Sequence, residues 1–209
     1  MSAIEKFDRV AEGYAERTYA DPEGFARARA HAVVSLGPPL EPGDSVLDLA
    51  CGDALAAGPL TELGLGYRGV DGSAGMIDQA RRRLGERVAL EVALMEDYSP
   101  PEPVAATIIL GAISYPIDRV AFLARVAGYT TKKLVFDFSP RDEDVAGIER
   151  DLRTAGLEPA ARRAFLLPRT RRLPGPAASA LRVLERSDAL ATLVLRRGGK
   201  WLYAAVPTR

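Results

Sequence analysis

The chain has 209 residues, a length that accommodates one α/β domain with a sizeable buried core. Hydrophobic residues make up 47% and charged residues 27%, a composition typical of folded chains, which excludes a disordered one. The 28 Lys and Arg residues are balanced by 28 Asp and Glu residues. No overall positive field is therefore available for nucleic acid, and only a local basic strip from Arg162 to Arg172 favours that partner.

Cysteine content and hydropathy limit the cellular setting. Cys51 is the only cysteine, which excludes an intrachain disulfide and a thiolate zinc cluster, and we expect no metal site. The opening MSAIEKFDRV lacks the apolar segment of a signal peptide. No apolar run approaches the roughly 18 residues that a membrane span needs. We therefore expect a cytoplasmic protein without a membrane span, whose oligomeric state the sequence does not define.

The first forty residues predict two helices. Apolar residues recur at helical spacing from Ile4 to Tyr14 and again from Phe25 to Leu36. Gly37-Pro38-Pro39 ends the second helix. From Ser45 onward, short apolar runs alternate with amphipathic stretches, which predicts βα units on a parallel sheet.

Seven strands are expected in this later part, near residues 45–50, 67–71, 88–93, 104–111, 132–138, 160–167 and 200–206. Helices are expected at 54–63, 74–84, 143–155 and 177–197, with Ser73 and Asp142 as N-caps of the second and third. The last strand follows an excursion of about thirty residues after another strand, so we expect it to run antiparallel at one side of the sheet. The predicted fold class is α/β, a doubly wound, seven-stranded, mostly parallel Rossmann-like sheet. Residues 1–209 are interpreted as a single domain, with 1–40 as a helical lid and 168–198 as a helical insertion on the substrate side.

A buried strand that ends in small residues carries the strongest functional signal. It reads Val46-Leu47-Asp48-Leu49-Ala50-Cys51-Gly52-Asp53-Ala54 and leads directly into a helix. Small residues allow a ligand to approach the main chain, and this end of a doubly wound sheet is where nucleotide-like ligands bind. Asp71 ends the next strand, and Gly72-Ser73 opens the helix after it. A carboxylate at that position can accept hydrogen bonds from both hydroxyls of a ribose.

Other functions fit parts of this pattern. A dinucleotide enzyme places an acid at the same point, but it needs G-x-G-x-x-G in the first loop to bind a pyrophosphate, and this loop has one glycine. An NAD(P)-dependent oxidoreductase therefore stays as an alternative, as does a catalytically silent binding module of the same fold. Aminopropyl transfer is disfavoured because no acidic pair for a polyamine is evident.

The run from Asp48 through Gly52 resembles motif I of the class I S-adenosylmethionine-dependent methyltransferases, with alanines at the two flanking glycine positions, 50 and 54. The opening Phe7–Tyr14 segment resembles the first helix of many small-molecule methyltransferases, and the resemblance extends over residues 5–140. It implies S-adenosylmethionine as cofactor, S-adenosylhomocysteine as product, and transfer of a methyl group to an O or N atom of a small-molecule acceptor.

The resemblance also implies roles for individual residues. Asp48 would orient the methionine ammonium group, Asp71 would bind the ribose and Met76 would lie against the adenine. Leu94 stands where an acid normally binds the adenine amino group, which leaves Glu96 or Asp97 as substitutes. The full expected set of cofactor-binding residues is Tyr14, Asp48, Ala50, Cys51, Gly52, Asp71, Gly72, Ser73, Met76, Met95, Glu96 and Leu110.

Methyl transfer from a sulfonium needs alignment of the acceptor more than a strong catalytic motif. If the acceptor is a hydroxyl, His31 or Tyr115 is the candidate base. The alternative for His31 is a packing or surface role on its helix, and for Tyr115 it is simple packing. Cys51 lacks a recognised nucleophile motif, so we interpret it as a small residue beside the ligand.

Overall fold

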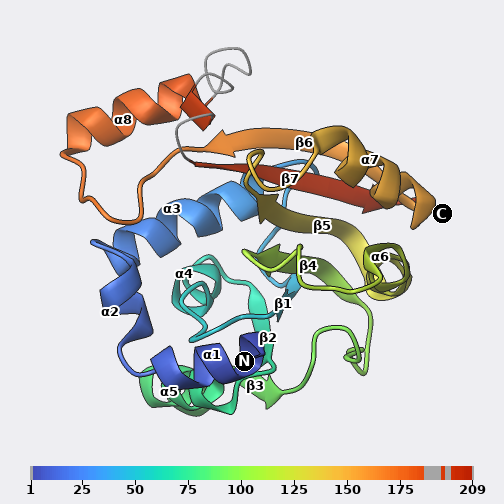
Figure 1. The fold of residues 1–209 in the computed structure, drawn as a ribbon, viewed down its shortest axis with the longest axis horizontal. Helices are drawn as coiled ribbons and strands as arrows, with labels where there is room; N and C mark the ends of the chain where they lie inside the picture. The colour runs from blue at the N-terminus through green and yellow to red at the C-terminus, as the bar shows by residue number, and fades with distance from the viewer. Residues whose placement is uncertain (1, 186–193, 196–198, 209) are drawn as a thin grey trace.

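The computed structural model describes residues 2–185, 194–195 and 199–208, and helices cover both faces of one sheet in it (Figure 1). Over these residues the sheet has seven strands in the order β3-β2-β1-β4-β5-β7-β6. The strands are β1 (Ser45–Leu49), β2 (Gly66–Asp71), β3 (Ala89–Val92), β4 (Val104–Leu110), β5 (Thr130–Phe138), β6 (Leu157–Phe165) and β7 (Lys200–Pro207).

Strand pairing confirms the predicted fold class. β1 pairs in parallel with β2 and β4, β2 with β3, and β4 with β5, while β7 runs antiparallel to both β5 and β6. The last strand lies one place in from the edge, between β5 and β6. Its five residues from Trp201 to Ala205 are all buried, whereas β6 alternates between buried and exposed positions. The continuous apolar strand therefore takes the interior place, and the alternating strand takes the edge.

The helices of the described residues are α1 (Ala3–Val10), α2 (Tyr14–Thr18), α3 (Pro22–Ser35), α4 (Ala57–Glu62), α5 (Ala74–Leu84), α6 (Arg119–Tyr129), α7 (Val145–Thr154) and α8 (Gly175–Leu184), with a 3₁₀ turn at Gly85–Arg87. The expected Ser73 cap of α5 is confirmed, since its Oγ accepts the Met76 N–H at 3.1 Å.

Three helix predictions need correction. The first predicted helix is two, because Gly13 has φ of 59°, in the left-handed region that interrupts a helix. Asp144, not Asp142, caps α7, accepting the Gly147 N–H at 2.8 Å. The helix predicted over 177–197 begins earlier, at Gly175, and ends at Leu184. Residues 194–195 are again helical, and the other residues of that prediction after Glu185, 186–193 and 196–197, lie outside the described residues.

Two apolar clusters lie on opposite faces of the sheet. Alternate residues of β5 divide between them: Phe136 joins the cluster beneath α6 and α7, and Val135 joins the cluster beneath α3 and α4. The helices α6 and α7 thus cover one face and α3 to α5 the other, while α1 and α2 lie toward the carboxyl ends of the parallel strands (Figure 1). No helix of the described residues is long and apolar enough to cross a membrane.

A buried cation fixes α3 against the sheet. The Lys133 side chain is fully buried, and its Nζ donates hydrogen bonds to the carbonyl oxygens of Val33 at 2.7 Å, Val34 at 3.0 Å and Leu36 at 2.8 Å. These carbonyls belong to the end of α3, where helix carbonyls lack partners and the helix dipole is negative. Lys133 therefore holds the helix that forms one wall of the site described below.

Replacing Lys133 with methionine is expected to lower the free energy of unfolding by about 2–4 kcal/mol, because the buried carbonyls of Val33 and Leu36 lose their donor and Val34 keeps only the Leu40 N–H. Urea denaturation followed by circular dichroism measures this change. Lys132→Met is the matched control, since Lys132 is partly exposed and pairs with Asp44 at 2.7 Å. The control should change stability by less than about 1 kcal/mol, and equal losses in the two variants would contradict the anchoring role.

Candidate active site

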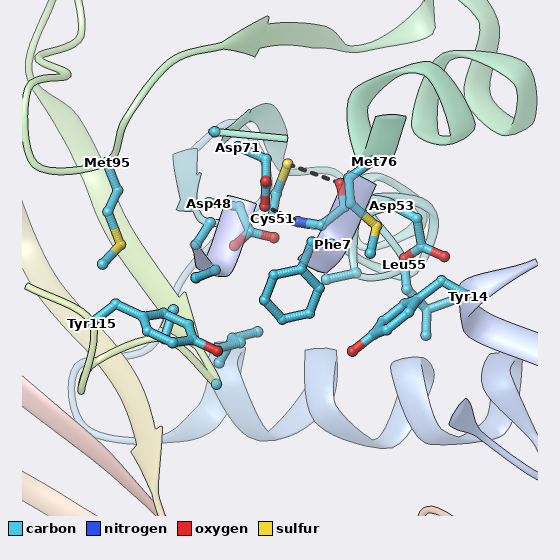
Figure 2. A pocket seen from close by; sticks show the side chains of 18 of the residues that line it. Phe7, Tyr14, Asp48, Cys51, Asp53, Leu55, Asp71, Met76, Met95 and Tyr115 are labelled. Carbon is cyan, nitrogen blue, oxygen red and sulfur yellow. Dashed lines mark hydrogen bonds between the residues drawn. The ribbon is translucent and has the colours of Figure 1, made fainter. Parts of the chain in front are cut away.

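A cavity of about 510 Å³ opens at the carboxyl ends of β1, β2 and β4. It lies where the strand order reverses, between β1 and β4, and its volume is typical of small-molecule sites. The sheet side of its wall is formed by the turns that follow these strands, and α1 to α3 form the opposite side (Figure 2). Its sheet-side lining residues include Asp48, Ala50, Cys51, Gly52, Asp53, Asp71, Gly72, Leu94, Met95, Glu96, Leu110, Gly111 and Ala112.

The turn after β1 has an unusual backbone. Ala50, Gly52 and Ala54 have φ values of 57°, 58° and 52°, all in the left-handed region. The two alanines adopt a conformation that favours glycine, at a cost of about 1–2 kcal/mol each. A Cβ placed on Gly52 would meet no atom within 4 Å, so this glycine faces open space in the cavity. The turn thus has a glycine-type shape even where its sequence departs from the glycine motif.

Asp71 connects two strand–helix turns. Its Oδ2 accepts the Gly52 N–H at 2.7 Å, and its Oδ1 accepts the Ser73 N–H at 2.8 Å. Burial raises the pKa of this carboxyl group, and the two hydrogen bonds oppose that rise. Each carboxylate oxygen has capacity for a further hydrogen bond, and Asp71 lines the cavity, so acceptor capacity remains for a ligand.

Asp48 lies in the same cavity and is more deeply buried. Only 2% of the residue is exposed, and its Oδ2 accepts the Tyr67 hydroxyl at 2.7 Å. Its Oδ1 is buried with no hydrogen-bond partner among the described residues. Burial raises the pKa of Asp48 to about 7. An incompletely satisfied buried carboxyl group is costly alone, and a cationic ligand group would relieve that cost.

The N-terminal helix docks onto the turn after β2. Asp8 Oδ1 accepts the Ser73 hydroxyl at 2.6 Å and the Gly75 N–H at 3.0 Å, at the start of α5 where helix N–H groups lack partners. A Cβ on Gly72 would lie 3.2 Å from Ile4 Cδ1, so α1 closely covers this turn. Sequence reasoning missed Asp8, because the helical period shows which face of α1 turns inward but not which element it meets.

Three aromatic rings cross the open side of the cavity. Phe7 makes edge contacts with Tyr14 at 6.1 Å and with Tyr115 at 6.5 Å between ring centroids. Figure 2 shows Phe7 between the two tyrosines. Tyr115 stays 47% exposed, whereas burial raises the pKa of Tyr14. These rings bring an apolar surface, carried by α1, α2 and the loop after β4, to this side of the cavity.

The structure brings most of the predicted residues together around this cavity. They are Tyr14, Asp48, Ala50, Cys51, Gly52, Asp71, Gly72, Met76, Met95, Glu96, Leu110 and Tyr115. Ser73 does not line the cavity and instead caps α5. His31 is exposed on α3 and does not line the cavity either.

Two expected cofactor-binding residues, Glu96 and Cys51, line the cavity in environments that restrict what they can do. Glu96 lines the cavity but its Oε1 accepts the Ile117 N–H at 3.0 Å, while Asp97 does not line it. Burial raises the pKa of the Cys51 thiol well above its usual range, which disfavours the thiolate that a nucleophile needs. Cys51 therefore has the environment of a small packing residue.

Arg29 is a cavity residue that sequence reasoning missed. The residue is 8% exposed, forms an ion pair with Asp137, and its Nε has no hydrogen-bond partner among the described residues. Burial lowers the pKa of the guanidinium to about 10, which leaves it charged at neutral pH. The available signal was its position on the apolar stripe of α3, one helical turn after Phe25 and one before Val33.

Comparisons with known proteins agree with this geometry. Residues 46–133 match the family model described as the methyltransferase domain. A search of the curated proteins finds no match to the chain. Residues 46–133 thus match a methyltransferase domain, and the sheet of the whole chain has the Rossmann-like methyltransferase fold.

Solved structures share the fold over nearly the full length of the chain. One is the CcbJ methyltransferase from Streptomyces caelestis, with a TM-score of 0.72, 14% identity and coverage of 100% of both chains. A second is magnesium protoporphyrin IX methyltransferase from Synechocystis PCC 6803 with bound S-adenosylmethionine (0.60, 18% identity, 100% of this chain and 85% of that one). A third is geranyl diphosphate C-methyltransferase from Streptomyces coelicolor A3(2), with a TM-score of 0.62, 18% identity and coverage of 94% of this chain and 84% of that one. At these identities the likeness shows the fold.

Proposed function

We propose that the cavity binds S-adenosylmethionine and that the chain transfers its methyl group to an O or N atom of a small molecule. The observation that carries the proposal is the meeting of Asp48 and Asp71 in one cavity, on either side of the open turn at Gly52. Each carboxyl group has unused acceptor capacity there, as the ammonium group and the ribose of the cofactor require.

The lining residues suit the parts of the cofactor in a definite order. The spare capacity of Asp71 suits the ribose hydroxyls, and the buried Met76 offers an apolar surface for the adenine. Asp48 suits the methionine ammonium group, and Arg29, which lines the same cavity, suits its carboxylate. The missing acid at Leu94 leaves Glu96 as the nearest carboxylate for the adenine amino group.

The bound cofactor supplies an activated methyl group on its sulfonium. The protein then has to hold the acceptor in line and exclude water, which the aromatic rings of Phe7, Tyr14 and Tyr115 do at the open side. The Tyr115 hydroxyl is the candidate proton acceptor when the acceptor atom is a hydroxyl oxygen. We assign His31 no part in transfer, since it does not line the cavity.

Calorimetry on the full chain with S-adenosylmethionine, S-adenosylhomocysteine and NAD tests the proposal. Both sulfur ligands should bind with Kd on the order of micromolar, and NAD should not. Binding of NAD but of neither sulfur ligand would contradict the proposal and favour an oxidoreductase. A silent binding module would bind the sulfur ligands but form no S-adenosylhomocysteine from S-adenosylmethionine with any acceptor.

We further propose that residues 1–40 act as a lid, together with segment 168–198, of which the structure describes 168–185 and 194–195 and Arg169 lines the cavity. The two parts of residues 1–40 differ, because α3 contributes buried residues such as Phe25 and Val33 to the core, whereas α1 has none. Deleting residues 1–12 removes Phe7 and Asp8 but leaves α3 in place. This deletion is expected to abolish transfer and raise the Kd for S-adenosylhomocysteine, measured by an activity assay and calorimetry. Full activity of the truncated chain, with an unchanged Kd, contradicts the lid.

A further inference from the structure

A second cavity of about 400 Å³ adjoins the first. The two share Phe25 and Arg169 in their walls, so they are neighbouring parts of one region. Most of the second cavity is apolar, and its polar groups gather at Asp137, Lys200 and Arg169. Its lining residues are Phe25, Asp137, Ser139, Phe165, Leu166, Leu167, Pro168, Arg169, Val194, Gly199 and Lys200.

Cations outnumber carboxylates where the two cavities meet. Asp137 is the carboxylate there, and its two oxygens are already paired, Oδ1 with Lys200 Nζ at 2.8 Å and Oδ2 with Arg29. The Arg169 guanidinium lies over the Tyr19 ring at 5.7 Å and forms no ion pair with the described residues. Asp48 lies near enough to Arg29 to interact with its charge, so three cations, Arg29, Lys200 and Arg169, are accompanied by two carboxylates in these walls.

Repulsion among the cations Arg29, Arg169 and Lys200 affects the pKa of Lys200. Burial, together with the positive charges of Arg29 and Arg169, lowers the pKa of Lys200 to about 7, while Asp142 opposes them. Asp142 is exposed to solvent and lines neither cavity. Positive charge is thus in excess in this partly buried region, where screening by water is reduced.

Lys200 reaches toward the first cavity as well. A Cβ placed on Gly111 would lie 3.4 Å from Lys200 Nζ, and Gly111 lines the first cavity at the end of β4. The cations therefore border the first cavity as well, since Arg29 and Arg169 line it and Lys200 approaches Gly111. One anion, the carboxylate of a bound cofactor, would balance one of these charges and leave another without a partner.

We propose that this second cavity binds a carboxylate group of the methyl acceptor, with Arg169 and Lys200 as its partners and the apolar wall around the rest of the molecule. The acceptor is then an amphipathic small acid, whose reacting atom extends toward the first cavity. This inference rests on the proposed function, because it assigns the substrate class of the same site. A neutral acceptor would leave the spare positive charge of these partly buried cations without a partner.

Calorimetry with a matched pair of probes tests the inference on the full chain, with and without saturating S-adenosylhomocysteine. The probes are 3-phenylpropionate and 3-phenylpropionamide, which share a shape and differ in charge. The acid is expected to bind about tenfold or more tightly than the amide, as charge-assisted hydrogen bonds require. Equal affinities, or no binding of the acid up to about 10 mM, would overturn the inference.

Arg169→Gln is expected to weaken binding of the acid by about tenfold while leaving the affinity for the amide unchanged. Arg171→Gln is the matched control, because Arg171 is exposed nearby and lines neither cavity. An equal loss in both variants would show a diffuse surface field and overturn the site. S-adenosylhomocysteine binding reports separately on the proposed function: if it fails, the titrations without this ligand still decide whether the second cavity prefers an anion.

Discussion

Replacing Asp71 with alanine is expected to weaken S-adenosylhomocysteine binding by about 10- to 100-fold, or roughly 1–3 kcal/mol. The change removes the proposed ribose acceptor and also releases the N–H groups of Gly52 and Ser73, which Asp71 holds at 2.7 and 2.8 Å. Both losses weaken ligand binding, because the first removes a ligand contact and the second loosens the turn at Gly52 that forms the cavity wall. Calorimetry at fixed pH measures the affinity directly.

Two controls separate ligand contact from a collapsed turn. Asp71→Asn keeps one acceptor oxygen and should lose less affinity than the alanine variant. Ser73→Ala removes the cap of α5 and the Asp8 contact but no proposed cofactor contact. It should cost about 1 kcal/mol of stability with a smaller effect on binding. An unchanged affinity in Asp71→Ala would remove the ribose assignment.

The local features of the fold could be predicted from the sequence because they depend on neighbouring residues. The strand that ends at Asp71 and the helix that begins after Ser73 follow from an apolar run and a capping side chain. The place of β7 inside the sheet could not, because strand order depends on pairing between distant segments. The break at Gly13 was missed because apolar residues continue at helical spacing across it.

The same distinction holds for the site. Asp48 and Asp71 could be brought together in advance, because the carboxyl ends of adjacent parallel strands share one edge of the sheet. The cluster of Arg29, Asp137 and Lys200 joins an N-terminal helix to two strands far along the chain. No spacing rule connects such residues. The one signal in the sequence is Arg29, a charged residue on the apolar stripe of α3, which indicates a buried ion pair but not its partner.

Cofactor binding is expected to release a proton from Asp48. The folded, empty protein holds the pKa of this carboxyl group at about 7, against 3.8 as its ordinary value. A cationic ammonium group favours the ionised form, so binding should tighten as pH rises through about 7 and then level off. Calorimetry of S-adenosylhomocysteine in buffers of different ionisation enthalpy detects the released proton.

In the protein without cofactor, the Asp48 carboxyl group makes stability fall as pH rises, whereas cofactor binding tightens over the same pH range. Because its pKa is raised by folding, the folded state holds a proton that the unfolded chain has lost between about pH 4 and pH 7. The contribution of Asp48 to stability is therefore fully present below pH 3.8 and is lost as pH rises through about 7. The loss amounts to roughly 4 kcal/mol. Urea denaturation across this range, compared with Asp48→Asn, isolates the contribution.

Asp48→Asn keeps an acceptor for the Tyr67 hydroxyl but cannot ionise. It should remove both the proton release and the pH dependence of binding, and above pH 7 its empty form should be more stable than the parent. Tyr67→Phe tests whether the pKa of Asp48 controls the pH dependence of binding. Its hydroxyl lowers the pKa of Asp48, so its removal should move the midpoint of tightening to higher pH. Binding that stays independent of pH in the parent protein would show that the ammonium group does not lie beside Asp48.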